Sequence, residues 1–206
     1  SEIDGVLGAV VEALEDKGVI NNTLIIMTSD NGANGGHANI GSKHRGTGMW
    51  EGDPIRGRKG DAWEGGHRVP YIARWGDGTA AGSVIKPGTV NNELLNLQDL
   101  FRTAAAIADT TLPDDVAVDS WNMLSAYLGD GSVQRIREAQ FSSSWKGAFA
   151  VAFYDNDGTE YKVIFASGSG GGISNPKGTI MNVNQNFNQL DLDHLQLYNM
   201  DEDVTE

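Results

Sequence analysis

The chain has 206 residues, 39% of them hydrophobic, which is enough for a large domain with a packed core. Its formal net charge of −13 argues against nonspecific binding to nucleic acid or to an anionic membrane surface, because like charges repel. The sequence contains no cysteine, which excludes disulfides and thiolate metal sites, and no apolar run of transmembrane length.

The first elements expected are a helix and a strand. Apolar residues between Ile3 and Leu14 recur three and one positions apart, which predicts a helix, and Gly18 provides a left-handed stop. Thr23–Thr28 is continuously apolar, which is typical of a strand covered on both faces in a parallel sheet. Ser29-Asp30-Asn31-Gly32 follows at the carboxyl end of this strand, where open α/β sheets place their ligands.

The middle of the chain is predicted to alternate loop, strand and helix. Residues 32–66 indicate a long loop, of a kind that is usually functional. A short strand is expected over 69–75. The apolar spacing then predicts a helix over 94–107, capped by Asn92 or Asn96, and a shorter helix over 120–128.

After about residue 133 the pattern changes to strands. The runs 148–154 and 160–165 are joined by Asp155-Asn156-Asp157-Gly158, which is a strong hairpin signal. We therefore expect an α/β fold with a mixed sheet and flanking helices over 1–135, and a small antiparallel β subdomain over 136–206.

Two segments have a composition suited to binding. Asp30 and Asn31 offer the hard oxygen ligands that Ca²⁺ or Mg²⁺ prefers, although taken alone the tetrapeptide is more typical of an ordinary Asp-Asn-Gly turn. Residues 54–70 concentrate cations and glycines in an acidic protein, which suits the recognition of an oxyanion. The alternatives are a solvated basic loop, or a buried ion pair between Glu64 and Arg68 that holds the loop.

Taken in order, these segments resemble the sulfatases of the alkaline-phosphatase superfamily. The resemblance rests on the stretches 22–32, 54–60, 63–70, 96–103 and 197–203, and on the N-terminal helix with Asp4 near its start. Any one of them is weak, but their joint order is specific. The chain resembles the C-terminal portion of an arylsulfatase-like enzyme.

The resemblance implies roles for particular residues. Asp30 and Asn31 match two ligands of a Ca²⁺ ion, and Lys59 matches a catalytic lysine that contacts the sulfate oxygens. His37 and His44 are candidates for a cationic rim that binds an anionic substrate, although a solvated variable loop accounts for them as well. His67 occupies a variable position of its motif and is expected to have no catalytic role.

The family nucleophile is a formylglycine made from Cys or Ser in a Cys/Ser-x-Pro-x-Arg motif, and no such motif is present. Because the nucleophile is absent, we expect this chain alone to be inactive. From the resemblance, we expect the full-length protein to hydrolyse sulfate esters, with carbohydrate sulfates among the candidates. With two ligands, Ca²⁺ binding by the chain alone is expected to be weak or absent. The alternatives are a phosphonate or phosphodiester hydrolase of the same superfamily and a non-catalytic anion-binding module.

Two further expectations follow from the resemblance. The family habit suggests a periplasmic or extracellular location, although no signal sequence is present in the chain. In the family, some neighbours of the strand at 23–28 come from a part that this chain lacks. An exposed sheet edge would then favour self-association.

Overall fold

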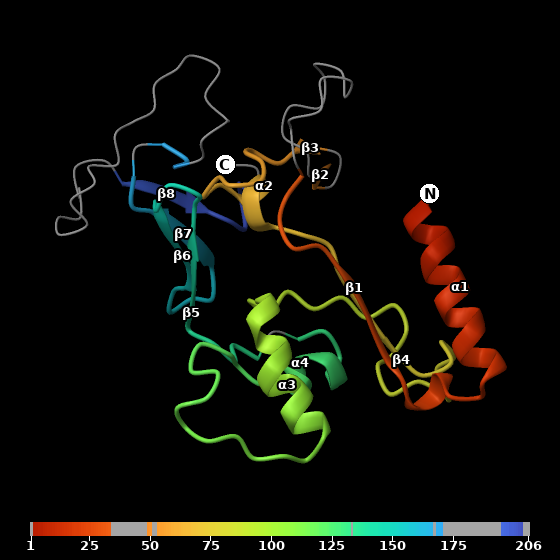
Figure 1. Cartoon of the computed structure of the whole chain (residues 1–206). Helices are drawn as coiled ribbons and strands as arrows, with labels where there is room; N and C mark the ends of the chain where they lie inside the picture. The colour runs from red at the N-terminus through yellow and green to blue at the C-terminus, as the bar shows by residue number, and fades with distance from the viewer. Residues whose placement is uncertain are drawn as a thin grey trace. The chain divides into compact units, whose positions relative to one another are not determined.

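A computed structural model of the chain describes residues 2–33, 49–50, 53–132, 134–166, 168–170 and 195–203 (Figure 1). They belong to two compact units, one made of residues 1–28 and 71–136, the other of residues 29–70 and 137–206. Helices and strands occur together, so the predicted α/β class is confirmed. The division into domains at residue 135 stays a prediction.

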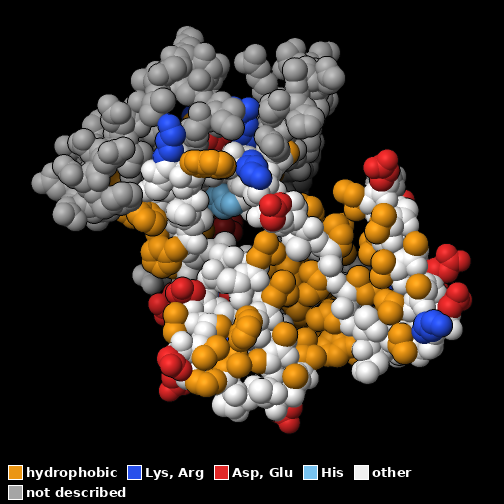
Figure 2. Space-filling view, in the orientation of Figure 1, with side chains coloured by type: hydrophobic (Ala, Val, Ile, Leu, Met, Phe, Trp, Pro, Cys, Tyr) orange, Lys and Arg blue, Asp and Glu red, His pale blue; other side chains and the backbone are white. Residues whose placement is uncertain are grey.

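The first unit begins with the predicted helix, α1 (Glu2–Asp16), followed by the 3-10 turn η1 (Ile20–Asn22). Gly18 has a φ of 68°, and its N–H donates to the Glu15 carbonyl at 2.9 Å, so the predicted left-handed stop is confirmed. Figure 2 shows acidic side chains along the outer margin of α1 and hydrophobic ones on its other side.

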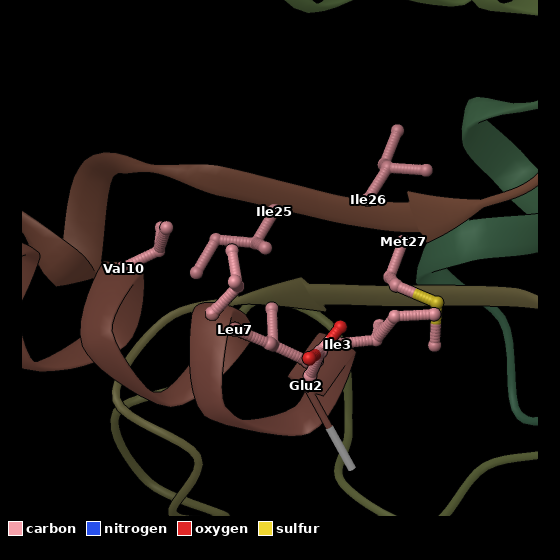
Figure 3. Close-up of a pocket in the computed structure, with 8 residues that line it drawn as sticks. Glu2, Ile3, Leu7, Val10, Ile25, Ile26 and Met27 are labelled. Atoms are coloured by element: carbon pink, nitrogen blue, oxygen red, sulfur yellow. The ribbon is translucent and has the colours of Figure 1, made fainter.

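Strand β1 (Leu24–Thr28) pairs with β4 (Tyr71–Trp75) in an antiparallel two-stranded sheet. The expected parallel sheet is therefore wrong for the described residues, because the chain returns along β1 through 71–75. Ile25 and Met27 point towards α1, and Ile26 points to the opposite side (Figure 3). On one side the strand lines a groove with α1, and it is only half-buried, so continuous hydrophobicity does not here indicate full burial.

The other helices of this unit are η2 (Leu97–Asp99), α3 (Leu100–Ile107) and α4 (Leu124–Leu128). The helix predicted over 94–107 begins later because Asn96 caps it: its side chain accepts from Gln98 N–H, and Asp99 accepts from Asn96 N–H. The helix predicted over 120–128 is confirmed only for its last five residues. Within the described parts of the chain, no helix is long and apolar enough to cross a bilayer.

The second unit contains the short pair β2 (Met49–Trp50) and β3 (Asp53–Pro54), and the one-turn helix α2 (Glu64–His67). Its main element is an antiparallel sheet in chain order: β5 (Ala139–Ser143), β6 (Phe149–Tyr154), β7 (Glu160–Ile164) and β8 (Gln196–Asn199). The predicted hairpin between β6 and β7 is confirmed, and Asp155 Oδ1 accepts three N–H groups within its turn.

The two faces of this sheet differ. On one face Ala150, Lys162 and Ile164 are buried, and Ala62 packs beside Ala150 and Ile164. On the other face Phe141 and Leu197 are largely exposed, and Phe149 is about half exposed. The buried face therefore contacts the loop that contains Lys59.

Candidate functional site

The turn after β1 contains the two predicted metal ligands. Asp30 is exposed and Asn31 is half-buried. Ser29 Oγ donates to the Asn31 carbonyl at 3.1 Å, and Asn31 Nδ2 donates to the Gly32 carbonyl at 2.9 Å. The second bond fixes the orientation of the amide, so Oδ1 is the atom available to a cation. The two side chains have the oxygen chemistry that Ca²⁺ prefers, and two ligands would make up only part of a full coordination shell.

Two backbone hydrogen bonds join this turn to the loop that contains Lys59. Gly32 N–H donates to the Gly66 carbonyl at 2.9 Å, and Lys59 N–H donates to the Ala33 carbonyl at 3.1 Å. A Cβ on Gly32 would overlap the carbonyl oxygen of Gly65, so the close approach requires glycine. The segments of the predicted metal ligands and the predicted sulfate-binding lysine are therefore neighbours.

The turn at Lys59 is held by a buried aspartate. Asp61 Oδ2 accepts from Arg58 N–H at 3.0 Å, and Oδ1 accepts from Ser169 Oγ at 2.7 Å. Ala62 N–H donates to the Ser169 carbonyl at 2.8 Å. Lys59 is thus half-buried on a turn whose backbone is fixed on both sides.

Glu64 lies at the centre of a buried charge cluster. Its Oε1 accepts from Lys162 Nζ at 2.7 Å and its Oε2 from Arg68 Nη1 at 2.9 Å. Burial disfavours the carboxylate, but Lys162, His67 and Arg68 outweigh it and lower the pKa of Glu64 to about 2. The predicted ion pair between Glu64 and Arg68 is present, and Lys162 is a partner that the sequence did not indicate.

His67 lies beside this cluster, with Nε2 at 3.4 Å from Glu64 Oε1. Burial, with the nearby charges of Lys162 and Arg68, lowers the pKa of His67 to about 4, against the opposing effect of Glu64. The imidazole is therefore neutral at pH 7, and its contact with Glu64 is polar rather than ionic.

A second group of contacts joins strand β8 to the same loop. The Arg56 guanidinium lies 3.8 Å over the Trp63 ring and donates to the Tyr198 hydroxyl at 3.2 Å. Trp63 Nε1 donates to Gln196 Oε1 at 3.1 Å, and the Tyr198 hydroxyl donates to the same atom at 2.7 Å. The closing motif at 197–203 thus places Tyr198 against the loop of the candidate site.

The sequence did not indicate a role for Lys162, because a lysine within the strand EYKVI is expected on the solvent-exposed face of a sheet. The carboxylate that it pairs with is 98 residues away in sequence. His37 and His44 lie outside the described residues, so their proposed role stays a prediction. Within the described ranges, no three His, Cys, Asp or Glu residues are grouped to hold a metal ion.

Comparison with known proteins identifies several sulfatases that are similar to this chain. A sequence model described as Sulfatase matches residues 1–110. Rat steryl-sulfatase is 36% identical over 130 residues, which is 62% of this chain and 21% of that protein. Human arylsulfatase D is 30% identical over 167 residues, covering 81% of this chain and 26% of that protein. Human N-acetylgalactosamine-6-sulfatase is 36% identical over 127 residues, which is 62% of this chain and 22% of that protein.

The chain therefore spans between a fifth and about a quarter of the length of these relatives. The match to the Sulfatase model covers more than half of the chain, including the Asp30 turn and the Lys59 loop. On that evidence the chain belongs to the sulfatase family.

Proposed function

We propose that this chain is part of an enzyme that hydrolyses sulfate esters. In it Lys59 contacts the sulfate group, and Asp30 and Asn31 are two of the ligands of a Ca²⁺ ion. The observation that supports this assignment is the hydrogen bond from Lys59 N–H to the Ala33 carbonyl, together with that from Gly32 N–H to Gly66. These bonds hold the turn that contains Asp30 and Asn31 next to the loop that contains Lys59.

Cleavage of a sulfate ester leaves negative charge on the departing oxygen and on the sulfate oxygens. The Lys59 ammonium has three donors and a full charge, so it can stabilise that charge as it develops. A bound Ca²⁺ would supply additional positive charge at the sulfate oxygens. The nucleophile is proposed to be a formylglycine in a part of the polypeptide outside this chain. The protein is proposed to act at a periplasmic or extracellular location.

The names of the relatives guide the choice of substrates. One is a steryl-sulfatase and another an N-acetylgalactosamine-6-sulfatase. We propose a sulfate ester of a ring-containing alcohol, with carbohydrate sulfates among the candidates.

The test measures turnover by the full-length protein with Lys59→Ala, using His67→Ala in the neighbouring helix α2 as the control. Losing one group that stabilises transition-state charge costs on the order of 10²–10³ in rate. Lys59→Ala should therefore lower the turnover rate by that factor, and His67→Ala should lower it far less. Equal small effects would contradict the assignment of Lys59. Faster turnover of an aryl phosphonate than of an aryl sulfate would favour the phosphonate hydrolase alternative.

A further inference from the structure

The turn between β5 and β6 presents a large exposed aromatic side chain beside the Lys59 loop. Trp145 is 74% exposed, and its backbone N–H donates to the Gly60 carbonyl at 2.9 Å. A Cβ built on Gly60 would lie 3.4 Å from Trp145 Cβ and 3.8 Å from Cε3 of the indole. The base of the indole therefore lies against the residue that directly follows Lys59.

Hydrogen bonds fix the backbone of this turn. Ser144 N–H donates to the Ala148 carbonyl at 2.8 Å, and Ala148 N–H donates to Ser144 Oγ at 2.9 Å. Lys146 N–H donates to the Gly170 carbonyl at 3.0 Å, in the segment that also holds Asp61 through Ser169. Ser144 and Ala148 are buried, whereas the indole between them is exposed.

An exposed indole on a fixed backbone is suited to binding. The turn already fixes the backbone of Trp145, so a ligand has only the two side-chain torsions of the indole to order, which keeps the entropic cost of binding low. Tryptophan offers a wide apolar face and one N–H donor, and it is enriched where a small number of residues dominate recognition. The large exposed area of Trp145 shows that it contributes little to the packed core of this unit.

We propose that Trp145 is a specificity residue, which stacks on a ring in the alcohol part of the sulfate ester whose sulfate group contacts Lys59. The inference rests on the function proposed for Lys59. The ligand chemistry is a ring with an apolar face, which an aryl group and a sugar both provide. A substrate without a ring has nothing to place on the indole.

The test uses the full-length protein with Trp145→Ala, Trp145→Phe and, as a control, Phe141→Ala, since Phe141 is 70% exposed on the other face of the same sheet. The substrates are 2-naphthyl sulfate, a monosulfated disaccharide and ethyl sulfate. Losing a stacked ring contact should raise KM about 5- to 10-fold for a ring substrate in Trp145→Ala. We expect kcat to change less than about twofold, Trp145→Phe to retain most of the affinity, and Phe141→Ala and ethyl sulfate to show no change.

A rise in KM for the naphthyl ester alone assigns an aryl ligand, and a rise for the disaccharide alone assigns a sugar. A fall in kcat with KM unchanged, or equal effects on ethyl sulfate, overturns the inference, because the indole would then only support the Lys59 loop. If the unaltered protein turns over none of these esters, the proposed function fails. The Kd ratios of the same compounds, from calorimetry on the same variants, then decide the role of Trp145 separately.

Discussion

Lys162 and Glu64 are 98 residues apart in sequence, and Lys162 Nζ donates to Glu64 Oε1 at 2.7 Å with only 1% of the lysine side chain exposed. The central strand β7 is thereby bonded to helix α2, which directly follows the Lys59 turn. Tyr198 and Gln196 of β8 reach the same loop. The C-terminal sheet thus fixes the segment that contains Lys59.

The first prediction concerns this ion pair. Lys162→Met removes the ammonium but leaves Glu64 buried with Arg68 as a remaining partner. Breaking a buried pair by removing one charge costs about 3–5 kcal/mol, so we expect a loss near the lower value. Urea unfolding of the protein measures it. The exposed Lys146→Met is the control and should change stability by less than about 0.5 kcal/mol. Similar values for both variants would show that the pair contributes nothing net.

The second prediction concerns the close packing of Gly66 against the backbone of Asp61. A Cβ on Gly66 would overlap the Asp61 carbonyl oxygen, so Gly66→Ala must displace the Lys59 turn. We expect it to destabilise the fold by at least about 2 kcal/mol and to reduce turnover in the full-length protein. Gly5→Ala is the matched control: a Cβ there meets nothing within 4 Å in helix α1, and it should stabilise by about 0.5–1 kcal/mol. A fully active, stable Gly66→Ala protein would contradict the packing described.

The third prediction concerns the cation. Two oxygen-bearing side chains fall short of the roughly six to eight ligands that Ca²⁺ prefers, so this chain alone should bind Ca²⁺ with a Kd weaker than about 1 μM. Calorimetry on the chain gives the value, and Asp30→Ala should abolish any binding that remains. In the full-length protein, by contrast, Asp30→Ala should weaken Ca²⁺ binding measurably. Submicromolar affinity in the isolated chain would show that other oxygen ligands complete the site.

Sequence patterns predicted the local elements well and the distant contacts poorly. The stripe from Ile3 to Leu14 and the turn at Asp155 specify a helix and a hairpin because both depend on neighbouring residues. Strands β5 and β8 were missed, since AQFSS and QLYN lack clear alternation and are defined by pairing with the hairpin. The same limit applies to Lys162, whose burial follows from a partner far away in sequence.

The candidate site follows the same rule. Asp30, Asn31 and Lys59 were proposed from motif order, and the backbone bonds between their segments could not be read from the sequence. The ion pair between Glu64 and Arg68 was one of the alternatives for its segment, but the short helix α2 that brings the two side chains together lies where a loop was expected. The position of Trp145 beside Gly60 depends on the docking of the β5–β6 turn, which no local pattern encodes.

The fourth prediction concerns self-association of the chain. The groove between α1 and β1 is lined by apolar residues and by Glu2 at one end, and Val6 on it is 65% exposed. Burying such surface contributes roughly 25 cal/mol per Å², which favours dimers. Val6→Lys should shift the protein towards monomer in analytical ultracentrifugation at tens of micromolar. Val90→Lys, in a loop and 76% exposed, should not. A chain that is monomeric before any substitution would rule out this groove as an interface.

The last prediction concerns Glu160, the first residue of β7. Burial, together with the negative charges of Glu64 and Asp201, raises its pKa from 4.5 to about 6, against the opposing effect of Arg68 and Lys162. Because the folded pKa is the higher one, the folded state binds the proton more tightly than the unfolded chain. The ionised carboxylate therefore lowers stability progressively from about pH 4.5 to 6, and the cost is complete at pH 7.

Glu160→Gln removes this cost and should raise the Tm at pH 7, while at pH 4 its Tm should be close to that of the unaltered protein, since the carboxyl is then mostly protonated in both states. Glu64 and His67 also titrate on acidification, and their lowered pKa values make the whole fold less stable at low pH. The comparison must therefore be made between proteins at each pH, with the exposed Glu138→Gln as control. A Tm gain for Glu160→Gln that is the same at pH 4 and pH 7 would show that the carboxylate bears no cost of burial beside Glu64.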